Sequence, residues 1–356
     1  MARIYFLILC LAAGLSSSLS AQDARFAQFY ANPLHVNPAM TGVFEGELRF
    51  TANYRTLYSS ILGTDAFRTI AAGLDIRRPA GRGNFIGIGA QVMRDQAGET
   101  RFTRTQGSIS GSFQKILGGG GRRGRGLTHY LVGGGSLGFG QRGFDIEKLW
   151  FSSQFFVDPA TRESYVDRGL DGEPDFIGGS SGLYLDFSAG ILWYGIFGDN
   201  QSMYAGASVH HLNEPNISLE DGGMDQLYRK YVGHIGGEVP FGSSGFSILP
   251  AAQVMSQGPA FSAMAGANLR YTQREWREVA LRIGAWAHLS NRLDKTSTDA
   301  MIVTAVLEMD AWQFGLSYDL TLSDLTNSNN GRGAFELSLI YVKEAKFRGR
   351  VDCPKF

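Results

Sequence analysis

Residues 312–342 read WQFGLSYDLTLSDLTNSNNGRGAFELSLIYV, two alternating arms around a turn rich in Asn and Gly. Because successive side chains of a strand point to opposite faces, each arm has one apolar face and one small or charged face. The apolar faces carry Trp312, Phe314, Leu316, Tyr318 and Leu320 in the first arm, and Phe335, Leu337, Leu339 and Tyr341 in the second. A soluble β-sandwich also alternates, but arms of about ten residues with such a face are typical of a transmembrane β-barrel.

The same alternation recurs along the chain and predicts about fourteen strands. It is regular in residues 48–55, 69–76, 86–92, 183–193, 263–271 and 279–288 and weak in residues 101–116, 127–140 and 300–308. An open sheet in lipid would leave unpaired backbone groups at its edges, so the strands must close. The predicted fold is an all-β, antiparallel, up-and-down outer-membrane barrel over residues 46–343, in which strand 332–342 pairs with strand 46–58.

The composition excludes several classes of protein. The chain has 33 basic and 33 acidic residues, so its net charge favours no nucleic-acid partner. Beyond residue 22 it has no apolar run of about eighteen residues, and therefore no predicted membrane helix. The mean hydropathy of −0.10 does not argue against a barrel, because half of each strand faces a polar lumen.

Residues 1–21 are predicted to be a secretory signal peptide. Arg3 precedes an apolar stretch, Ile4 to Leu15, that is too short to span a bilayer, and small residues follow it. Cleavage is expected before Gln22. The mature chain would then keep a single cysteine, Cys353, which has no partner for an internal disulfide.

The connections between strands predict an orientation. Outer-membrane barrels have short periplasmic turns and longer outer loops. If the first strand runs outward, the outer connections are expected near residues 59–66, 94–100, 141–180, 212–226, 257–260, 289–298 and 322–331, and the inner ones near 79–83, 117–125, 197–200, 240–244, 273–275 and 309–310. The outer set is longer in most cases and includes the two longest. This pattern predicts that both termini, including a tail at residues 344–356, face the periplasm.

A barrel of this size encloses a lumen wider than wall side chains fill, so a plug or a cargo is expected inside. Two segments are candidates for the plug: loop 141–180 and the N-terminal segment 22–45. The second has two Asn-Pro pairs, which favour turns over a helix. The favoured interpretation is a periplasmic lead-in packed under the barrel, and the alternative is a plug or a docking strip for a partner. Its candidate contact residues are Phe26, Phe29, Tyr30, Asn32, Pro33, Asn37 and Pro38.

The inward-facing charges mix both signs, which predicts mutual neutralisation within the lumen rather than a selective ion channel. Glu336 is expected to meet Arg49, Arg55 or another lumen cation once the first and last strands pair. The predicted lumen network comprises Arg49, Arg55, Asp75, Arg282, Asp319 and Glu336.

No catalytic, metal or cofactor site is predicted, and the chain is not expected to be an enzyme. His210 and His211 are adjacent, so in a regular strand they would point to opposite faces, which is poor geometry for one metal or one triad. The acidic stretch at residues 167–175 lacks the alternate spacing of a calcium loop.

Several motifs, in order, resemble the PorP/SprF family from about Gln22 to the C-terminus. They are Gln28-Phe29-Tyr30, Asn32-Pro33-Leu34, Asn37-Pro38-Ala39, Asn53-Tyr54-Arg55, His211-Leu212, Glu214-Pro215-Asn216, Ser317-Tyr318-Asp319, Gly331 to Glu336, and Cys353-Pro354. One departure is Thr56-Leu57, where the family often has an aromatic residue after the Arg of the first strand.

The resemblance implies an outer-membrane component of the type IX secretion system of Bacteroidota. Such a protein would bind the C-terminal domain of a secreted or surface protein, such as a gliding adhesin, and contact lipoproteins of the machinery. Outer-membrane lipid would surround it. Candidate partner-binding residues outside the N-terminal segment are His211, Glu214, Pro215, Asn216 and Cys353. The alternatives are a channel for small solutes, a barrel hydrolase that uses the histidine pair, and a soluble β-sandwich.

Overall fold

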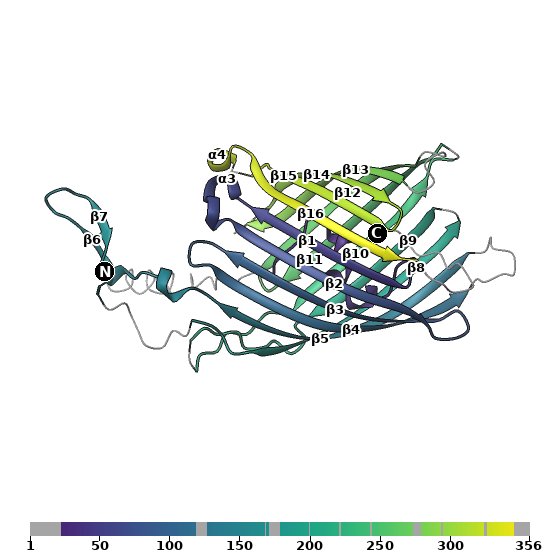
Figure 1. Cartoon of the computed structure of the whole chain (residues 1–356), viewed down its shortest axis with the longest axis horizontal. Helices are drawn as coiled ribbons and strands as arrows, with labels where there is room; N and C mark the ends of the chain where they lie inside the picture. The colour runs from purple at the N-terminus through teal and green to yellow at the C-terminus, as the bar shows by residue number, and fades with distance from the viewer. Residues whose placement is uncertain are drawn as a thin grey trace, which may run out of the picture.

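The computed structural model describes residues 23–118, 127–167, 169–170, 179–198, 200–220, 222–242, 244–272, 279–292, 295–323 and 326–344. Fourteen antiparallel strands form one closed barrel in which each strand pairs with its neighbours along the chain (Figure 1). The predicted fold class and strand number are therefore confirmed. The predicted signal peptide and nearly all of the C-terminal tail, including Cys353, lie outside the described residues.

The barrel strands are long enough to cross a bilayer with tilt. They are β1 (Leu48–Leu57), β2 (Phe67–Pro79), β3 (Phe85–Ala97), β4 (Phe102–Gly118), β5 (Thr128–Gly143), β8 (Tyr184–Gly198), β9 (Gln201–His210), β10 (Lys230–Pro240), β11 (Phe246–Gln257), β12 (Ala260–Thr272), β13 (Val279–Arg292), β14 (Lys295–Met309), β15 (Trp312–Thr321) and β16 (Arg332–Lys343). A separate hairpin pairs β6 (Phe155–Val157) with β7 (Ser164–Val166). The short helices are η1 (Phe29–Ala31), α2 (Pro33–Val36), η2 (Pro38–Met40), α3 (Ser59–Leu62), η3 (Gly63–Asp65), η4 (Ile146–Lys148), η5 (Ser152–Gln154) and α4 (Thr326–Asn329).

The segments with weak alternation are also strands. In β5, Gly133, Gly134 and Gly135 are consecutive, so glycine occupies both faces of the wall. The apolar and polar residues therefore do not alternate there in the sequence. Backbone pairing with β4 and β8 on the two sides nevertheless holds this stretch in register.

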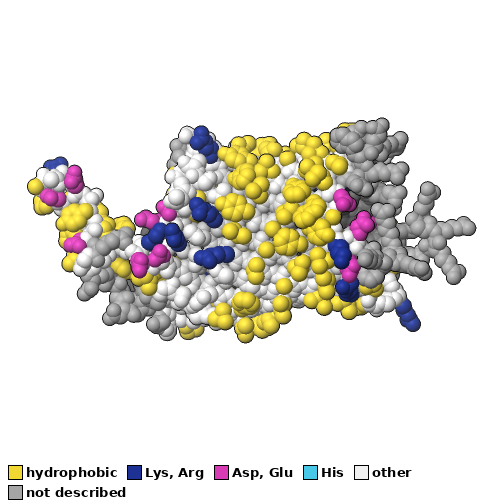
Figure 2. Space-filling model, viewed as in Figure 1, with side chains coloured by type: hydrophobic (Ala, Val, Ile, Leu, Met, Phe, Trp, Pro, Cys, Tyr) yellow, Lys and Arg dark blue, Asp and Glu magenta, His cyan; other side chains and the backbone are white. Residues whose placement is uncertain are grey.

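The outside of the barrel wall is apolar. Alternate residues such as Ile70, Ile88, Ile109, Leu185 and Ile283 are more than half exposed. Figure 2 shows such side chains over the middle of the wall, with charged side chains toward the two ends. This distribution matches a hydrocarbon band between two polar interfaces. Among the described residues, no helix is both long and apolar enough to span a bilayer.

The barrel closes where β1 pairs with β16, as predicted. Leu48 lies opposite Lys343 and Leu57 lies opposite Ala334, and Arg55 faces Glu336 directly. The C-terminal hairpin, residues 312–342, therefore supplies one side of the seam.

The two ends of the barrel differ. The long-loop end carries the connections 58–66, 144–183, 211–229 and 322–331, whereas the short-turn end carries brief connections such as 199–200 and 310–311. The connection predicted near 257–260 lies at the long-loop end as a short turn at residues 258–259. The connection predicted near 289–298 is too long, because β13 continues to Arg292 and β14 begins at Lys295. The hairpin β6–β7 stands away from the barrel at the end where α3 and α4 lie (Figure 1).

Candidate functional site: the lumen plug and its mouth

The N-terminal segment lies inside the barrel. Residues from Phe26 to Phe44 are buried except His35, which is half-buried, and several pack with inward-facing wall residues in one hydrophobic cluster. We refer to residues 23–46 as the plug. The favoured prediction of a lead-in under the barrel is wrong for this segment, and loop 144–183 leaves its described hairpin outside the barrel.

The plug contains the short helices η1, α2 and η2, each of three or four residues, where its Asn-Pro pairs predict turns rather than a helix. Pro33 begins α2 and Pro38 begins η2, where a missing backbone N–H has no cost. The side chain of Asn37 accepts a hydrogen bond from the N–H of Ala39, and its amide donates to the carbonyl groups of Ile191 and Ala207 in the wall. The same Asn therefore caps a turn and attaches the plug to β8 and β9.

The first anchor of the plug is Glu336 in the closing strand. Its carboxylate accepts hydrogen bonds from the backbone N–H groups of Ala27 and Gln28 at 2.7 and 2.9 Å, and from Arg55 at 3.0 Å. Arg55 also donates to Asp319 at 2.5 Å. All three charged side chains are at most 6% exposed, so the anchor lies in a low-dielectric setting where its hydrogen bonds are strong.

The second anchor is a bidentate pair between Arg49 and Asp75. The guanidinium donates to both carboxylate oxygens at 2.8 and 3.0 Å, and also to the carbonyl groups of Met40 and Val43 in the plug. Asp75 in turn accepts from the N–H of Gly42 at 2.7 Å. Arg49 thus donates to backbone carbonyl groups of the plug, and Asp75 accepts from a backbone N–H of the plug. These plug groups have no partner in the sheet ladder, so the ion pair satisfies them.

The other wall charges of the predicted lumen network also pair. Arg282 contacts Glu308, which accepts from Arg270 at 2.9 Å, and Arg270 lies 3.6 Å from Glu238. Aromatic side chains of the plug also meet the wall. The ring centroids of Phe29 and Tyr30 each lie 5.7 Å from that of Trp286 in β13. Charged and aromatic groups therefore both fill the lumen around the plug.

Glycines in the wall provide the space that the plug backbone occupies. A Cβ at Gly134 would lie 2.6 Å from the backbone of Ala39, and one at Gly87 would lie 2.2 Å from the carbonyl oxygen of Thr41. Contacts this short do not occur in real structures, so these wall positions accept only glycine while the plug is seated.

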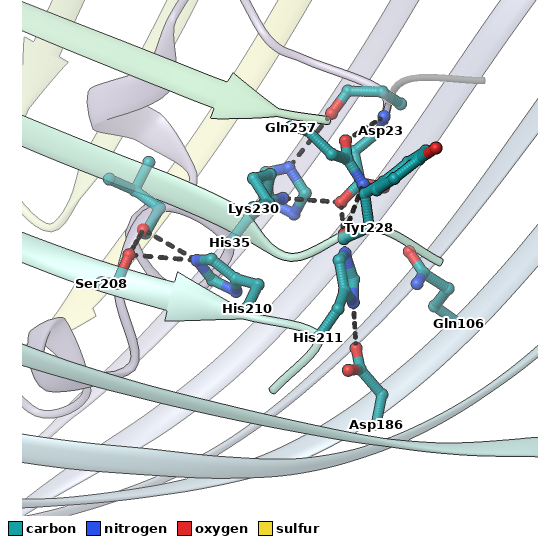
Figure 3. Close-up of polar contacts among 12 residues, drawn as sticks. Asp23, His35, Gln106, Asp186, Ser208, His210, His211, Tyr228, Lys230 and Gln257 are labelled. Carbon is teal, nitrogen blue, oxygen red and sulfur yellow. Dashed lines mark hydrogen bonds and ion pairs between the residues drawn. The ribbon is translucent and has the colours of Figure 1, made fainter. Parts of the chain in front are cut away.

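At the long-loop end the plug ends in a cluster of buried charges around Asp23 (Figure 3). Its carboxylate accepts from Lys230 at 2.7 Å and from Gln257 at 3.1 Å, and it pairs with Arg104. Its backbone N–H donates to Gln257 at 2.9 Å. We call the cluster Asp23, Arg104, Arg142, Asp186, His211, Lys230 and Gln257 the mouth cluster.

His211 lies between two carboxylates, 2.9 Å from Asp23 and 2.8 Å from Asp186. Carboxylates only accept hydrogen bonds, so both ring nitrogens must donate and the imidazole is charged. Burial opposes this charge, but the two carboxylates raise the pKa of His211 above its ordinary value. Burial alone would raise the pKa of Asp23, yet Arg104, Lys230 and His211 hold it well below its usual range.

The attachment of Asp23 should weaken with rising pH. The pKa of His211 is higher in the folded protein than its ordinary value of 6.5. The ion pairs of protonated His211 with Asp23 and Asp186 therefore contribute fully to stability below pH 6.5, and this contribution is lost as pH rises through the folded pKa. A nitroxide attached at position 24 (Ala24→Cys in a Cys353→Ser background) should therefore become more mobile as pH rises through the raised pKa of His211. His211→Gln should remove this pH dependence, and an unchanged profile in that variant would contradict the assignment.

The histidine pair does not have the geometry predicted from regular alternation. His210 and His211 are both buried, because His211 takes a left-handed conformation with φ of 59° and ends the strand. His210 contacts Ser208 and the carbonyl of Val36 in the plug, apart from the carboxylates (Figure 3). Among the described residues, no carboxylate contacts His210 and no hydroxyl contacts His211, so neither completes a Ser-His-Asp triad.

The predicted partner-binding residues fall into two groups. All those in the plug are buried against the wall, so they contact the barrel itself: Phe26, Phe29, Tyr30, Asn32, Pro33, Asn37 and Pro38. In loop 211–229, Glu214 is half-buried near Arg229, Pro215 is buried, and Asn216 is exposed. His211 is buried in the mouth cluster.

Sequence reasoning missed Asp23, Arg104, Lys230 and Glu308 as members of these clusters. Asp23 follows the expected cleavage site by one residue, and Arg104 lies in a segment with weak alternation. Only the register of the strands brings them together. The described residues contain no group of His, Cys, Asp and Glu side chains suited to a metal ion.

The described ends of the chain lie at opposite ends of the barrel. Asp23 contacts the ends of β10 and β11 beside the long loops, whereas Glu344 follows Lys343, which pairs with Leu48 at the short-turn end. The prediction that both termini face one compartment is therefore wrong for these ends, because the plug runs the length of the lumen before β1 begins.

The hairpin β6–β7 exposes several large apolar side chains outside the membrane band. Phe156 and Tyr165 stack with their ring centroids 5.9 Å apart while 39% and 54% exposed. Val157 and Trp150 are also exposed, at 54% and 47%. The hairpin is ordered by its own turn, in which Asp158 accepts from the N–H groups of Ala160 and Thr161.

Comparison with solved structures finds outer-membrane barrels. A mutant of the TodX monoaromatic hydrocarbon channel is 12% identical, with 87% of this chain and 94% of that chain covered and a TM-score of 0.44. The translocator domain of the autotransporter NalP from Neisseria meningitidis is 11% identical, with 88% and 95% covered and a TM-score of 0.34. The KdgM porin is 9% identical, with 82% and 98% covered and a TM-score of 0.34.

No curated protein matches the chain. A family does: the model of the type IX secretion system membrane protein PorP/SprF matches residues 18–341, nearly the whole sequence. The family and the closed barrel together place the protein in the outer membrane. The chain belongs to the PorP/SprF family and is an outer-membrane component of the type IX secretion system.

Proposed function

We propose that the barrel anchors or receives a cognate secreted or surface protein, whose C-terminal domain docks at the long-loop end. The observation that carries this proposal is the plug. A lumen filled by the chain's own residues and held by buried ion pairs favours a binding role over an open channel for small solutes. The family and the fold likewise suggest a role without catalysis.

Loop length supports the long-loop end as the extracellular end. Glu344 and the tail that follows it, with Cys353, would then face the periplasm, where lipoproteins and other parts of the machinery are the expected partners. Asp23 would lie near the cell exterior. This orientation places the mouth cluster and the hairpin β6–β7 on the side from which a surface protein is reached.

The hairpin β6–β7 is the proposed docking surface for the secreted protein. Stacked aromatic side chains exposed to water on a projecting hairpin gain free energy when a partner covers them. Aromatic residues also dominate the energetics of protein interfaces. Loop 211–229 is the second surface at this end. Asn216 orders it by donating a hydrogen bond to the carbonyl of Gly223 and accepting from the N–H groups of Ser218 and Asp225.

Replacing both stacked rings should release the partner. Phe156→Ser with Tyr165→Ser is expected to reduce the secreted protein that co-purifies from native membranes in mild detergent by about tenfold or more. Mass spectrometry quantifies that protein relative to the barrel. The matched control is Ile61→Ser with Leu62→Ser, two residues exposed by 50% and 38% in α3 at the same end. Equal recovery with both double variants would contradict the hairpin as the docking surface.

A further inference from the structure

We propose that the mouth of the lumen is a binding site for a peptide carboxylate, with Arg142 as the principal ligand and Arg104 beside it. The carboxylate would belong to an extended segment of the secreted protein that reaches the long-loop end. This inference rests on the proposed function and names the chemistry by which the partner is held.

The site begins with two like charges that face each other. Arg104 in β4 lies directly opposite Arg142 in β5, and their side chains are only 6% and 7% exposed. Like charges directly opposite on one face of a sheet are destabilising, and burial reduces the screening between them. Two buried guanidinium groups in this arrangement lower the stability of the fold unless anions neutralise their charges.

The anions present neutralise only one of the two. Arg104 pairs with Asp23, which also serves Lys230 and His211. Among the described residues, the only carboxylate paired with Arg142 is that of Asp225, which lies 3.9 Å away on a side chain that is 63% exposed. Within the described part of the chain, the Nε of Arg142 is buried and has no hydrogen-bond partner. One guanidinium at the mouth therefore retains unused donors.

A small cavity adjoins the mouth cluster. Its volume is about 60 Å³, and its lining includes Asp23, His211 and Lys230 but neither Arg104 nor Arg142. Much of its remaining lining is small or hydroxylated: Gly107, Ser108, Ser136, Gly138 and Ser188. A cavity of this size has room for water rather than for a peptide backbone, so the peptide would stay at the mouth and only its carboxylate would reach Arg142.

The position of the site favours a peptide over a lipid headgroup. Arg104 and Arg142 point into the lumen, on the opposite face of the wall from Phe139 and Ile109, which are exposed on the lipid side. A phosphate of a membrane lipid lies outside the barrel, whereas a peptide from a docked protein can reach the mouth. A guanidinium with free donors suits a carboxylate, which it binds in a directed, planar geometry.

The test uses the purified full-length barrel in detergent and three synthetic peptides. They are Ac-GSGSGS with a free C-terminus, the same peptide as its C-terminal amide, and Ac-GSEGSG-amide, which carries only a side-chain carboxylate. Calorimetric titration should show binding of at least one acid peptide that is about tenfold tighter than that of the neutral amide. Arg142→Gln should remove this difference, Arg142→Lys should restore part of it, and Arg229→Gln, at an arginine 46% exposed near the same mouth, should leave it intact.

The outcomes separate this inference from the proposed function. Equal binding of acid and amide peptides by the wild-type barrel, or an unchanged difference in Arg142→Gln, would overturn the carboxylate site. Inorganic phosphate that binds as tightly as the acid peptides would show a general anion site instead and would overturn it as well. Recovery of the secreted protein with the wild-type barrel tests the proposed function by itself, because the peptide titration requires no secreted protein.

Discussion

Gly134→Val should open the barrel to ions. The added Cβ would lie 2.6 Å from the Cα and N of Ala39 and from the carbonyl oxygen of Pro38, three backbone atoms that cannot rotate away. Overlap of this size expels the nearest movable element, and the plug is held to the wall by side chains rather than by sheet pairing. In planar bilayers we expect the wild-type barrel to be closed and the variant to show stable ionic conductance, since a barrel of fourteen strands without its plug has a wide lumen.

The matched control is the preceding residue. Gly133 faces the outside of the same strand, and a Cβ there meets nothing within 4 Å. The barrel with Gly133→Val should therefore show no stable conductance, although it carries the same change in composition and strand propensity. A Gly134→Val barrel as closed as Gly133→Val would show that the plug tolerates the overlap. Stable conductance by the wild type would instead favour the solute-channel hypothesis.

Glu336→Ala should cause the largest loss of stability from a single charged residue. The carboxylate is fully buried and serves Arg55 and two backbone N–H groups of the plug. Removing one partner of a buried ion pair costs about 3–5 kcal/mol, because the remaining groups stay buried and unsatisfied. Asp319 still pairs with Arg55, so we expect the lower part of that range. Denaturant unfolding in detergent, followed by heat-modifiable gel migration, measures the change.

The control for this prediction is an exposed ion pair. Glu214 lies 3.5 Å from Arg229, and the two side chains are 38% and 46% exposed. Glu214→Ala should cost less than about 1 kcal/mol, because water screens the pair. Equal losses of stability in the two variants would mean that the anchor at Glu336 contributes no more than a surface contact.

The barrel wall was predictable because it obeys a local rule. Alternation depends on neighbouring residues alone, and it located the hairpin around Ser323 and the pairing of β1 with β16. The rule failed where glycine replaced the apolar residue, as at Gly133 and Gly135, and where a strand continued past its regular pattern, as at the end of β13. In those places pairing with adjacent strands determines the structure, and a single sequence does not display that pairing.

The plug was not predictable to the same degree. A turn-rich segment with Phe29 and Tyr30 has the same pattern whether it packs under the barrel or inside it. The two positions differ in whether wall glycines make room for the plug backbone. Gly87 and Gly134 lie against the plug, Gly134 against Ala39, and the sequence does not show this until the register of the wall strands is known. The mouth cluster depends on seven separate parts of the chain, so Asp23 and Arg104 carried no signal of their own.

Glu336 has a consequence for how the protein is made. It belongs to the last strand of the barrel, yet it binds Ala27 and Gln28, which precede the first strand. The hydrogen bonds that seat the plug and the Arg55–Glu336 contact across the β1–β16 seam thus share one side chain. We expect the N-terminal segment to lie within the curled sheet before the final strand pairs with β1. Closure of the wall and seating of the plug would then be coupled during biogenesis.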